Sequence, residues 1–284
     1  MKKSSFVLLL GETNAGKSTL LNKIIGEKIS IVSHKVQTTR YKILGIYTKN
    51  ESQLVFIDTP GIFNPQRNFD SNMVNISYSQ IEEADNIIFL LDANKGLTKL
   101  SEQIIEKLPK NKKNLFVINK IDLISKDKLL EIINVIKSYD KFDDFFYISA
   151  KNGNGVEPLV KYLLHNAKED NWYYDEDQTS DQPLFKIAEE ISRENIYEYV
   201  HQELPYNIAL EHISWEEDAN HIKINQNIYV INDNHKGMLL GKGGIKIKQI
   251  RVASQKAMEK VFHKKVSLFL FVKVNSKWLD QQLN

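Results

Sequence analysis

The sequence contains no cysteine among its 284 residues. Disulfide frameworks and thiolate metal sites are therefore excluded, which suits a protein of a reducing cytosol. Long hydrophobic runs are also lacking, since no segment approaches the roughly 20 apolar residues that span a bilayer. The run FVLLL near the N-terminus is shorter than the roughly 7–15 residues of a signal-peptide core. We interpret it as a buried first strand.

The net charge of +2 is unevenly distributed along the chain. Residues 221–284 carry 12 Lys or Arg against 3 Asp or Glu, a net charge of +9. The preceding 220 residues carry 26 against 33, a net charge of −7. A basic C-terminal block on an acidic body indicates binding of a polyanion at that end, although a solvated lysine-rich surface would give the same count.

Apolar, β-branched runs alternate with segments of helical spacing over the first 165 residues. Nearly all-apolar strands between helices predict an α/β domain with a mostly parallel sheet covered on both faces. A short TKNES turn predicts that the second and third strands form an antiparallel hairpin. The predicted strands are SFVLLL, YKILGIY, QLVFID, NIIFLLD, NLFVIN and DFFYIS, and the helical segments include STLLNKIIG and KDKLLEIINVIKSY.

A polar segment, NAKEDNWYYDEDQTSDQP, interrupts this pattern with six Asp or Glu and a terminal proline. Such composition is typical of an interdomain linker. The order of elements then changes to helix, two long strands, helix and strand, which predicts a smaller α+β domain. We therefore expect a first domain over residues 1–167, an acidic linker over 168–183 and a second domain over 184–284.

The segment GETNAGKS, residues 11–18, fits the phosphate-loop pattern of Gly, four residues and Gly-Lys-Ser/Thr. It lies between a predicted strand and a predicted helix, where backbone N–H groups and the helix N-terminus would face a phosphate. Lys17 would neutralise the β- and γ-phosphates, and Ser18 would ligate Mg²⁺. A chance match would explain the pattern but not its strand–loop–helix context.

Further segments supply the remaining parts of a nucleotide site. LVFIDTPG ends a strand in Asp58, which suits the metal side, and the Gly61 N–H would reach the γ-phosphate. In NKID, the Asp122 carboxylate can accept hydrogen bonds from guanine N1–H and N2–H₂, a donor pair that adenine lacks. An Asp after a strand is more often a turn former, so NKID gains its weight from the other segments.

GETNAGKS, DTPG, NKID and ISA resemble, in order and spacing, the motifs of the Ras-like GTPases. The resemblance implies that Thr39 reaches Mg²⁺ in the GTP state, with the adjacent Thr38 as the alternative. It also implies that Asn119 meets the guanine N7 edge, that Lys120 packs beside the base and that the Ala150 N–H meets the base oxygen. The metal ligands would be Ser18, Thr39 and Asp58, and the GTP-binding residues would be Gly11, Glu12, Thr13, Asn14, Ala15, Gly16, Lys17, Ser18, Thr19, Asp58, Thr59, Pro60, Gly61, Ile62, Asn119, Lys120, Asp122, Ser149, Ala150 and Lys151.

Ras-like enzymes usually carry a glutamine directly after the Asp-x-x-Gly motif, where it orients the attacking water. Ile62 occupies that position here and cannot hydrogen-bond a water. We therefore expect slow intrinsic hydrolysis, with Lys17, Thr39 and Gly61 as catalytic groups and help from a partner or an ion. The resemblance suggests K⁺, because GTPases with an asparagine at the Asn14 position are often potassium-activated; alternatively, Asn14 only braces the loop backbone.

A second Gly–Lys loop, GKGG at residues 241–244, lacks the spacing and the hydroxyl of a phosphate loop. Its Gly-x-x-Gly pattern would allow a sugar–phosphate backbone to approach closely, and the following helix is basic. Helical spacing assigns Ile247, Ile250, Ala257, Met258 and Val261 to the core. An ordinary helix-entry turn is the alternative. The expected RNA contacts are Gly241, Lys242, Gly243, Gly244, Lys246, Lys248 and Arg251.

LGKGGIKIKQI resembles the KH single-stranded RNA module, and the order of elements from residue 184 is that of the bacterial-type (type II) KH fold. A Ras-like P-loop GTPase domain followed by a KH domain is similar to the Era family of bacterial GTPases over nearly the whole chain. The match is incomplete, because Thr13 and Arg251 stand where the family usually has proline and glycine.

The Era resemblance implies a cytoplasmic, monomeric switch that binds GTP and GDP, the 3′ region of 16S ribosomal RNA and the 30S subunit. Its role would lie in assembly of that subunit and maturation of its RNA. Peripheral attachment to the inner face of the cell membrane is an alternative location, although no segment resembles an anchor. Two rival functions are a non-catalytic RNA-binding assembly factor that uses GTP only for stability, favoured by Ile62, and an ATP-dependent enzyme, disfavoured by Asp122.

Overall fold

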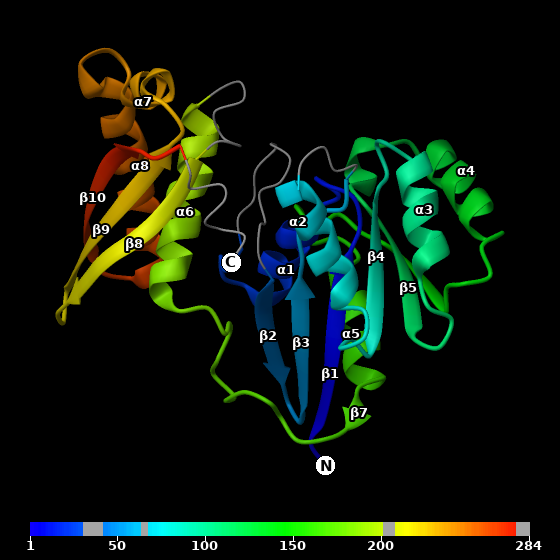
Figure 1. Cartoon of the computed structure of the whole chain (residues 1–284). Helices are drawn as coiled ribbons and strands as arrows, with labels where there is room; N and C mark the ends of the chain where they lie inside the picture. The colour runs from blue at the N-terminus through cyan, green and yellow to red at the C-terminus, as the bar shows by residue number, and fades with distance from the viewer. Residues whose placement is uncertain (31–41, 64–67, 201–207, 277–284) are drawn as a thin grey trace. The chain divides into compact units, whose positions relative to one another are not determined.

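The computed structural model describes residues 1–30, 42–63, 68–200 and 208–276. The chain divides into two compact units, Met1–Asp181 and Gln182–Asn284 (Figure 1). The first unit contains a mostly parallel sheet with helices, and the second contains a three-stranded sheet with helices. No helix within the described ranges combines the length and the apolar character required to cross a membrane.

The sheet of the first unit has the strand order β2-β3-β1-β4-β5-β6. β1 runs parallel to both β3 and β4, whereas β2 and β3 form the predicted antiparallel hairpin. The predicted α/β fold with a mostly parallel sheet is therefore confirmed. The strands are β1 (Lys3–Leu10), β2 (Ile43–Lys49), β3 (Ser52–Asp58), β4 (Asn86–Asp92), β5 (Lys113–Asn119) and β6 (Asp144–Tyr147).

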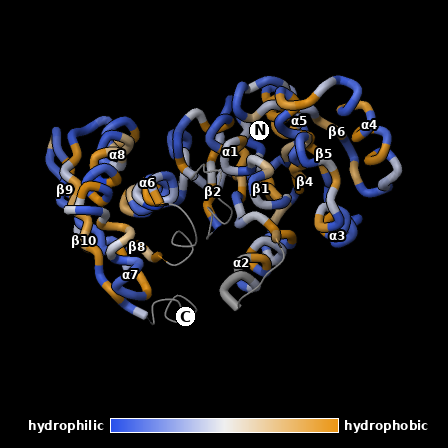
Figure 2. Tube along the Cα trace, turned by 90° about the horizontal axis from the view of Figure 1, so that it is seen from above, coloured by the Kyte–Doolittle hydropathy of each residue, from blue (hydrophilic) through white to orange (hydrophobic). Residues whose placement is uncertain are grey.

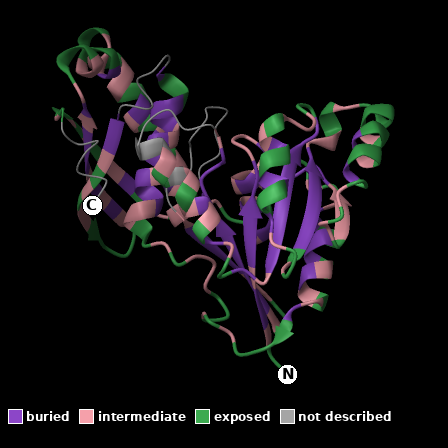
Figure 3. Cartoon of the chain, turned by 45° about the vertical axis from the view of Figure 1, so that its right-hand side comes forward, coloured by how far each residue is buried: buried purple, intermediate pink, exposed green. Residues whose placement is uncertain are grey.

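Alternate residues of β1 enter two hydrophobic cores, one on each face of the sheet. Val7 and Leu9 pack with helices α1 and α5, whereas Leu8 and Leu10 pack with α3 and α4. The strands consequently form a buried layer (Figure 3), and hydrophobic residues concentrate along them (Figure 2). The helices are α1 (Lys17–Ile25), α2 (Asn68–Ser79), α3 (Lys99–Lys107), α4 (Lys126–Ile136), α5 (Val156–His165) and the one-turn η1 (Ile121–Leu123).

In the second unit, β9 lies between β8 and β10, antiparallel to β8 and parallel to β10. Ile250 and Met258 of α8 are fully buried against this sheet, as their spacing predicted. The short helix α7 was not predicted, because Leu239 is its only buried residue and its sequence has little amphipathic pattern. The elements are α6 (Leu184–Tyr199), β8 (Ile208–Glu217), β9 (His221–Val230), α7 (Asp233–Leu240), the one-turn η3 (Lys242–Gly244), α8 (Ile245–Phe262) and β10 (Lys265–Val274).

Most of the acidic segment 168–183 packs against the first unit. Its start forms β7 (Lys168–Glu169), which pairs with β1. The buried Gln53 side chain accepts hydrogen bonds from the Tyr173 and Tyr174 N–H groups at 3.0 and 3.1 Å, and it donates to the Tyr174 carbonyl at 3.0 Å. The Gln53 side chain thus hydrogen-bonds to backbone N–H and C=O groups of the segment, as the backbone of a neighbouring strand would.

The end of the same segment lies along the edge of β2. The Ile46 N–H donates to the Thr179 carbonyl at 2.9 Å, and the Ser180 hydroxyl donates to the Leu44 carbonyl at 2.9 Å. The Leu44 N–H donates to the Asp181 carboxylate at 3.2 Å. These bonds use backbone groups and short polar side chains, so an acidic composition does not prevent the segment from being fixed.

We expect Gln53→Ala to release the middle of this segment, because it removes the three hydrogen bonds between Gln53 and the segment and leaves the backbone groups of Tyr173 and Tyr174 unpaired. Proteases should cleave between residues 170 and 181 faster, and the free energy of unfolding of the first unit should fall by about 2 kcal/mol. Gln103→Ala, at an exposed position of α3, is the control. Equal cleavage rates in both variants would contradict the role of Gln53.

Candidate functional site

Four strands of the first unit deliver the candidate nucleotide-binding segments to one edge of the sheet. β1 leads into the loop 11–18, β3 ends at Asp58, β4 ends at Asp92 and β5 ends at Asn119. Because these strands are parallel, their carboxyl ends meet at the same edge, which is where open α/β sheets bind ligands. Motifs that are far apart in the chain therefore lie together in a single site.

The loop 11–18 encloses the Lys17 ammonium group. Nζ donates to the carbonyls of Gly11 and Glu12, each at 3.1 Å. Burial lowers the pKa of Lys17 to about 8, opposed by the nearby carboxylates of Asp58 and Glu12. A cation held in this desolvated position favours an anionic ligand, whose charge would stabilise the protonated form.

Glycine is required at Gly16, where α1 begins. Its φ of 100° lies in the left-handed region, and a Cβ there would come within 2.2 Å of the Asn119 Nδ2. The loop therefore packs directly against the end of β5. This close packing leaves the N-terminus of α1 facing the loop interior, as a phosphate site requires.

Asp58 is the carboxylate expected from the sequence on the metal side of the site. Its Oδ2 accepts hydrogen bonds from the Ser18 hydroxyl at 2.7 Å and from the Ser30 hydroxyl at 2.8 Å. Its Oδ1 is buried without a hydrogen-bond partner among the described residues. Burial raises the pKa of this carboxyl, and Lys17 and the two serine hydroxyls oppose that effect. An unpaired carboxylate oxygen beside a serine hydroxyl fits the oxygen ligands of a hydrated Mg²⁺.

Ser30 was not identified from the sequence. Asn22 of α1 holds it, because the Asn22 Nδ2 donates to the Ser30 carbonyl at 2.8 Å and the Asn22 Oδ1 accepts from the Ile29 and Ser30 N–H groups, both at 3.0 Å. No motif marks a serine at this distance from the phosphate loop. The expected ligand Thr39 and its alternative Thr38 lie outside the described residues.

Asn119 and Lys120 join the phosphate loop to the base-side segments. The Asn119 side chain donates to the Ala15 carbonyl at 2.8 Å and accepts from the Ala150 N–H at 2.9 Å. Lys120 Nζ donates to the Asn14 carbonyl at 2.7 Å and forms an ion pair with Asp92 at 2.6 Å. Asp92 was missed in the sequence, although an Asp ending a parallel strand was an available signal.

Asp122 lies solvent-exposed on η1, two residues after Lys120. Lys120 has a φ of 64°, which turns the chain at the end of β5. Nearby, Ser149 is buried and Lys151 is exposed. The carboxylate therefore lies just beyond the carboxyl end of β5, at the same sheet edge as the phosphate loop.

Ile62 is buried in the hydrophobic core, with 2% of its surface exposed. Its N–H donates to the Gly11 carbonyl at 3.0 Å, and its carbonyl accepts from the Thr13 N–H at 3.2 Å. Gly61 packs equally closely, because a Cβ there would lie 2.6 Å from the Thr13 Cα. The DTPG segment is thus joined to the phosphate loop by its backbone, and the side chain at position 62 belongs to the core.

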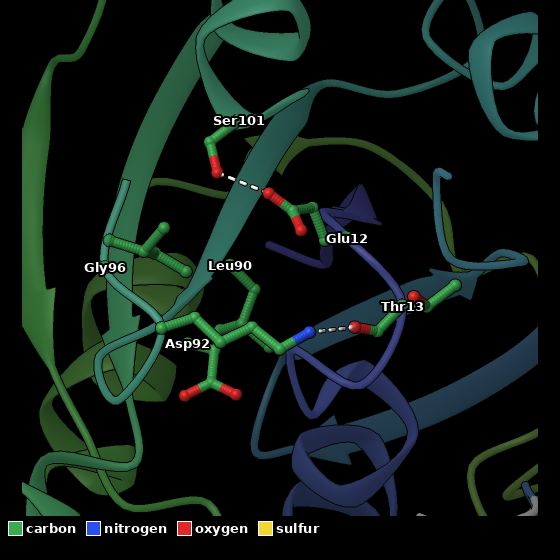
Figure 4. A pocket seen from close by; sticks show the side chains of 8 residues that line it. Glu12, Thr13, Leu90, Asp92, Gly96 and Ser101 are labelled. Carbon is green, nitrogen blue, oxygen red and sulfur yellow. Dashed lines mark hydrogen bonds between the residues drawn. The ribbon is translucent and has the colours of Figure 1, made fainter. Parts of the chain in front are cut away.

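A small pocket lies between the phosphate loop and the connection from β4 to α3 (Figure 4). Glu12 and Thr13 line one side, and Asp92, Lys95 and Ser101 are among the residues of the other side. The Glu12 side chain, expected to belong to the GTP-binding set, points to Ser101 of α3.

The Gly-x-x-Gly segment of the second unit joins α7 to α8. Gly241, Gly243 and Gly244 have φ values of 72°, 60° and 77°, so the loop conformation favours glycine. A Cβ at Gly243 or Gly244 would meet no atom within 4 Å. The loop backbone is therefore open to close approach by a ligand.

Basic side chains surround the N-terminus of α8. Lys242 and Lys248 are exposed, whereas Lys246 and Arg251 are half-buried, and Arg251 donates to the Gln255 Oε1 at 3.2 Å. The first turn of α8 carries no acidic residue. Positive side chains and a helix N-terminus together favour a phosphate backbone at this loop.

Two family models match the chain: that of the 50S ribosome-binding GTPases over residues 6–120 and that of the KH domain over residues 196–279. GTPase Era of Agrobacterium fabrum is 45% identical over 280 residues, which are 98% of this chain and 88% of that protein. GTPase Era of Rhizobium meliloti is 44% identical, over 98% of this chain and 90% of that protein.

Solved structures agree with these sequence matches. The crystal structure of an Era protein in complex with MgGDPNP and nucleotides 1506–1542 of 16S ribosomal RNA has a TM-score of 0.93 and 35% identity. It covers 98% of this chain and 96% of that one. An Aquifex aeolicus Era variant bound to GDP·AlF₄⁻ has a TM-score of 0.92 and 35% identity, over 98% and 95% of the two chains.

We expect Ser30→Ala to raise the Mg²⁺ concentration needed for half-maximal GTP hydrolysis by about fivefold, because Asp58 loses one of its two hydroxyl donors and is held less firmly. A Mg²⁺ titration of phosphate release measures this. Ser5→Ala is the control, since Ser5 is equally buried in the same unit and its hydroxyl accepts a hydrogen bond from Asn86 at 2.8 Å. An unchanged Mg²⁺ requirement in Ser30→Ala would show that Ser30 has no such role.

Proposed function

Because the chain belongs to the Era family of GTPases, we propose that it hydrolyses GTP as a switch and binds the 3′ region of 16S ribosomal RNA in assembly of the 30S subunit and maturation of its RNA. The observation that carries this proposal is the meeting of four separate segments at one sheet edge, where an exposed Asp122 follows two residues after Lys120, whose ammonium group donates to the Asn14 carbonyl of the phosphate loop. The Gly-x-x-Gly loop of the second unit supports the RNA part.

In this proposal each charged group has a separate task. Lys17 and the loop N–H groups bind the phosphates, and the N-terminus of α1 adds its positive end. Ser18 and Asp58, with Thr39, would hold Mg²⁺, which when bound neutralises charge between the β- and γ-phosphates. Asp122 selects guanine, since a carboxylate pairs with two adjacent donors that adenine does not present.

Intrinsic hydrolysis should be slow because Ile62 occupies the position of the usual glutamine, and its apolar side chain, which lies in the core, cannot hydrogen-bond a water. The backbone N–H of Gly61 and the Lys17 ammonium remain as groups that can stabilise charge on the γ-phosphate. We further propose K⁺ as an activator near Asn14, which adopts a left-handed conformation with φ of 64° in the phosphate loop.

The proposed base selection predicts that Asp122→Ala loses the preference for GTP over ATP in a phosphate-release assay. In the unchanged protein the preference should be at least about a hundredfold, because adenine presents no donor pair to the Asp122 carboxylate. Asp127→Ala, an exposed carboxylate in the first turn of α4, is the control and should keep the preference.

Hydrolysis of ATP as fast as GTP by the unchanged protein would refute the proposed function. Running the same assay in potassium and sodium salts tests the ion, and equal rates would exclude it. Absence of phosphate release in both salts, with and without ribosomal RNA, would favour the non-catalytic assembly factor, the alternative that the position of Ile62 supports.

RNA binding through the second unit predicts that Lys242→Ala weakens affinity for a 16S 3′-end oligonucleotide. The slope of the logarithm of the binding constant against the logarithm of the salt concentration should fall by about one, because one phosphate contact is lost. Lys260→Ala, in the last turn of α8, removes the same charge far from the loop and is the control. Measurements with GDP and with a non-hydrolysable GTP analogue test the switch. Equal RNA affinity in the two nucleotide states would contradict coupling between the sites.

A further inference from the structure

Glu12 places a carboxylate inside the phosphate loop, which is an unfavourable location for a negative charge next to an anionic ligand. The structure resolves this conflict by directing the side chain away from the loop interior (Figure 4). Its Oε1 accepts hydrogen bonds from the hydroxyls of Thr98 and Ser101, the latter at 2.6 Å. Both donors lie at the N-terminus of α3.

Thr98 and Ser101 also form the capping box of α3. The Ser101 N–H donates to the Thr98 hydroxyl oxygen at 3.0 Å, and the Thr98 N–H donates to the Ser101 hydroxyl oxygen at 3.3 Å. The box therefore uses the two hydroxyls only as acceptors, and both hydroxyl protons remain for Glu12. Because the N-terminus of a helix carries partial positive charge, α3 additionally stabilises the carboxylate.

The next two residues of the loop, Thr13 and Asn14, accept hydrogen bonds from lysines near the ends of β4 and β5. Lys95, in the connection from β4 to α3, donates to the Thr13 carbonyl at 3.5 Å. Lys120, paired with Asp92 at the end of β4, donates to the Asn14 carbonyl at 2.7 Å. Three successive loop residues are thus fixed by groups attached to β4, α3 and the end of β5.

We propose that Glu12 is a positioning residue that, through Thr98 and Ser101, ties the phosphate loop to α3 and holds it in its nucleotide-binding conformation before a nucleotide arrives. The inference rests on the proposed function, since it assigns a role within the same nucleotide site. A loop held in advance loses less conformational freedom on binding, so the hydrogen bonds increase affinity without contacting the nucleotide. GDP and GTP benefit equally, because both present phosphates to the same backbone.

The test is nucleotide affinity in variants of the full chain. Glu12→Ala should weaken binding of both GDP and the non-hydrolysable GTP analogue about tenfold, as expected for loss of hydrogen bonds to a charged group. KM should rise far more than kcat falls, because the contact is made equally in the ground and transition states. Glu12→Gln should recover most of the affinity, since its carboxamide oxygen can accept from both hydroxyls.

Ser101→Ala and Ser125→Ala provide the matched comparison. Each removes a serine hydroxyl from a helix N-terminus, of α3 and α4 respectively, but only Ser101 contacts Glu12. Both should lower the unfolding temperature of the nucleotide-free protein, Ser101→Ala more because Ser101 is buried and Ser125 is exposed, whereas only Ser101→Ala should weaken nucleotide binding. This comparison separates positioning from loss of a helix cap.

Unchanged affinity in Glu12→Ala, or equal losses of affinity in Ser101→Ala and Ser125→Ala, would overturn the proposed role of Glu12. Either result would leave the proposed GTPase function intact, provided that the unchanged protein binds guanine nucleotides. Failure of the unchanged protein to bind them would instead refute the proposed function itself.

Discussion

Two opposite charges, on Lys17 and Asp58, are buried at the carboxyl edge of the parallel sheet. Burial of each charge alone would cost several kcal/mol, so the surrounding structure must compensate it. Loop carbonyls accept from Lys17, and the hydroxyls of Ser18 and Ser30 donate to Asp58. The compensation is partial, because burial still lowers the pKa of Lys17 and raises the pKa of Asp58, and both shifts favour the neutral form.

The two hydrophobic cores stabilise this arrangement. β1 delivers the phosphate loop and lies between the strands that carry Asp58 and Asp92, and its alternate residues are buried on both faces. A rigid central strand fixes where the loop begins, and the backbone bonds of Ile62 to Gly11 and Thr13 fix where the DTPG segment passes. The charged groups of Lys17 and Asp58 are thereby held at the sheet edge and cannot readily turn toward solvent.

The two Gly–Lys loops differ physically in how much space surrounds their glycines. Gly11 lies against the Leu90 carbonyl and Gly16 against Asn119, so the first loop is enclosed by protein atoms and suits a compact phosphate group. Gly243 and Gly244 face open space, so the second loop suits an extended ligand that passes over it. Steric enclosure, rather than the shared Gly–Lys sequence, separates a nucleotide loop from one suited to an RNA backbone.

Local periodicity and motif spacing were sufficient to predict the α/β class, the β2–β3 hairpin, the order of the nucleotide motifs and the core residues Ile250 and Met258. Three contacts became known only from the folded chain: Ser30 with Asp58, Glu12 with α3, and the acidic segment with β2. These contacts join residues 28, 89 and 136 positions apart in the chain. Such pairings leave no periodic signal, since they arise where parallel strands bring distant segments to the same edge or beside the same strand.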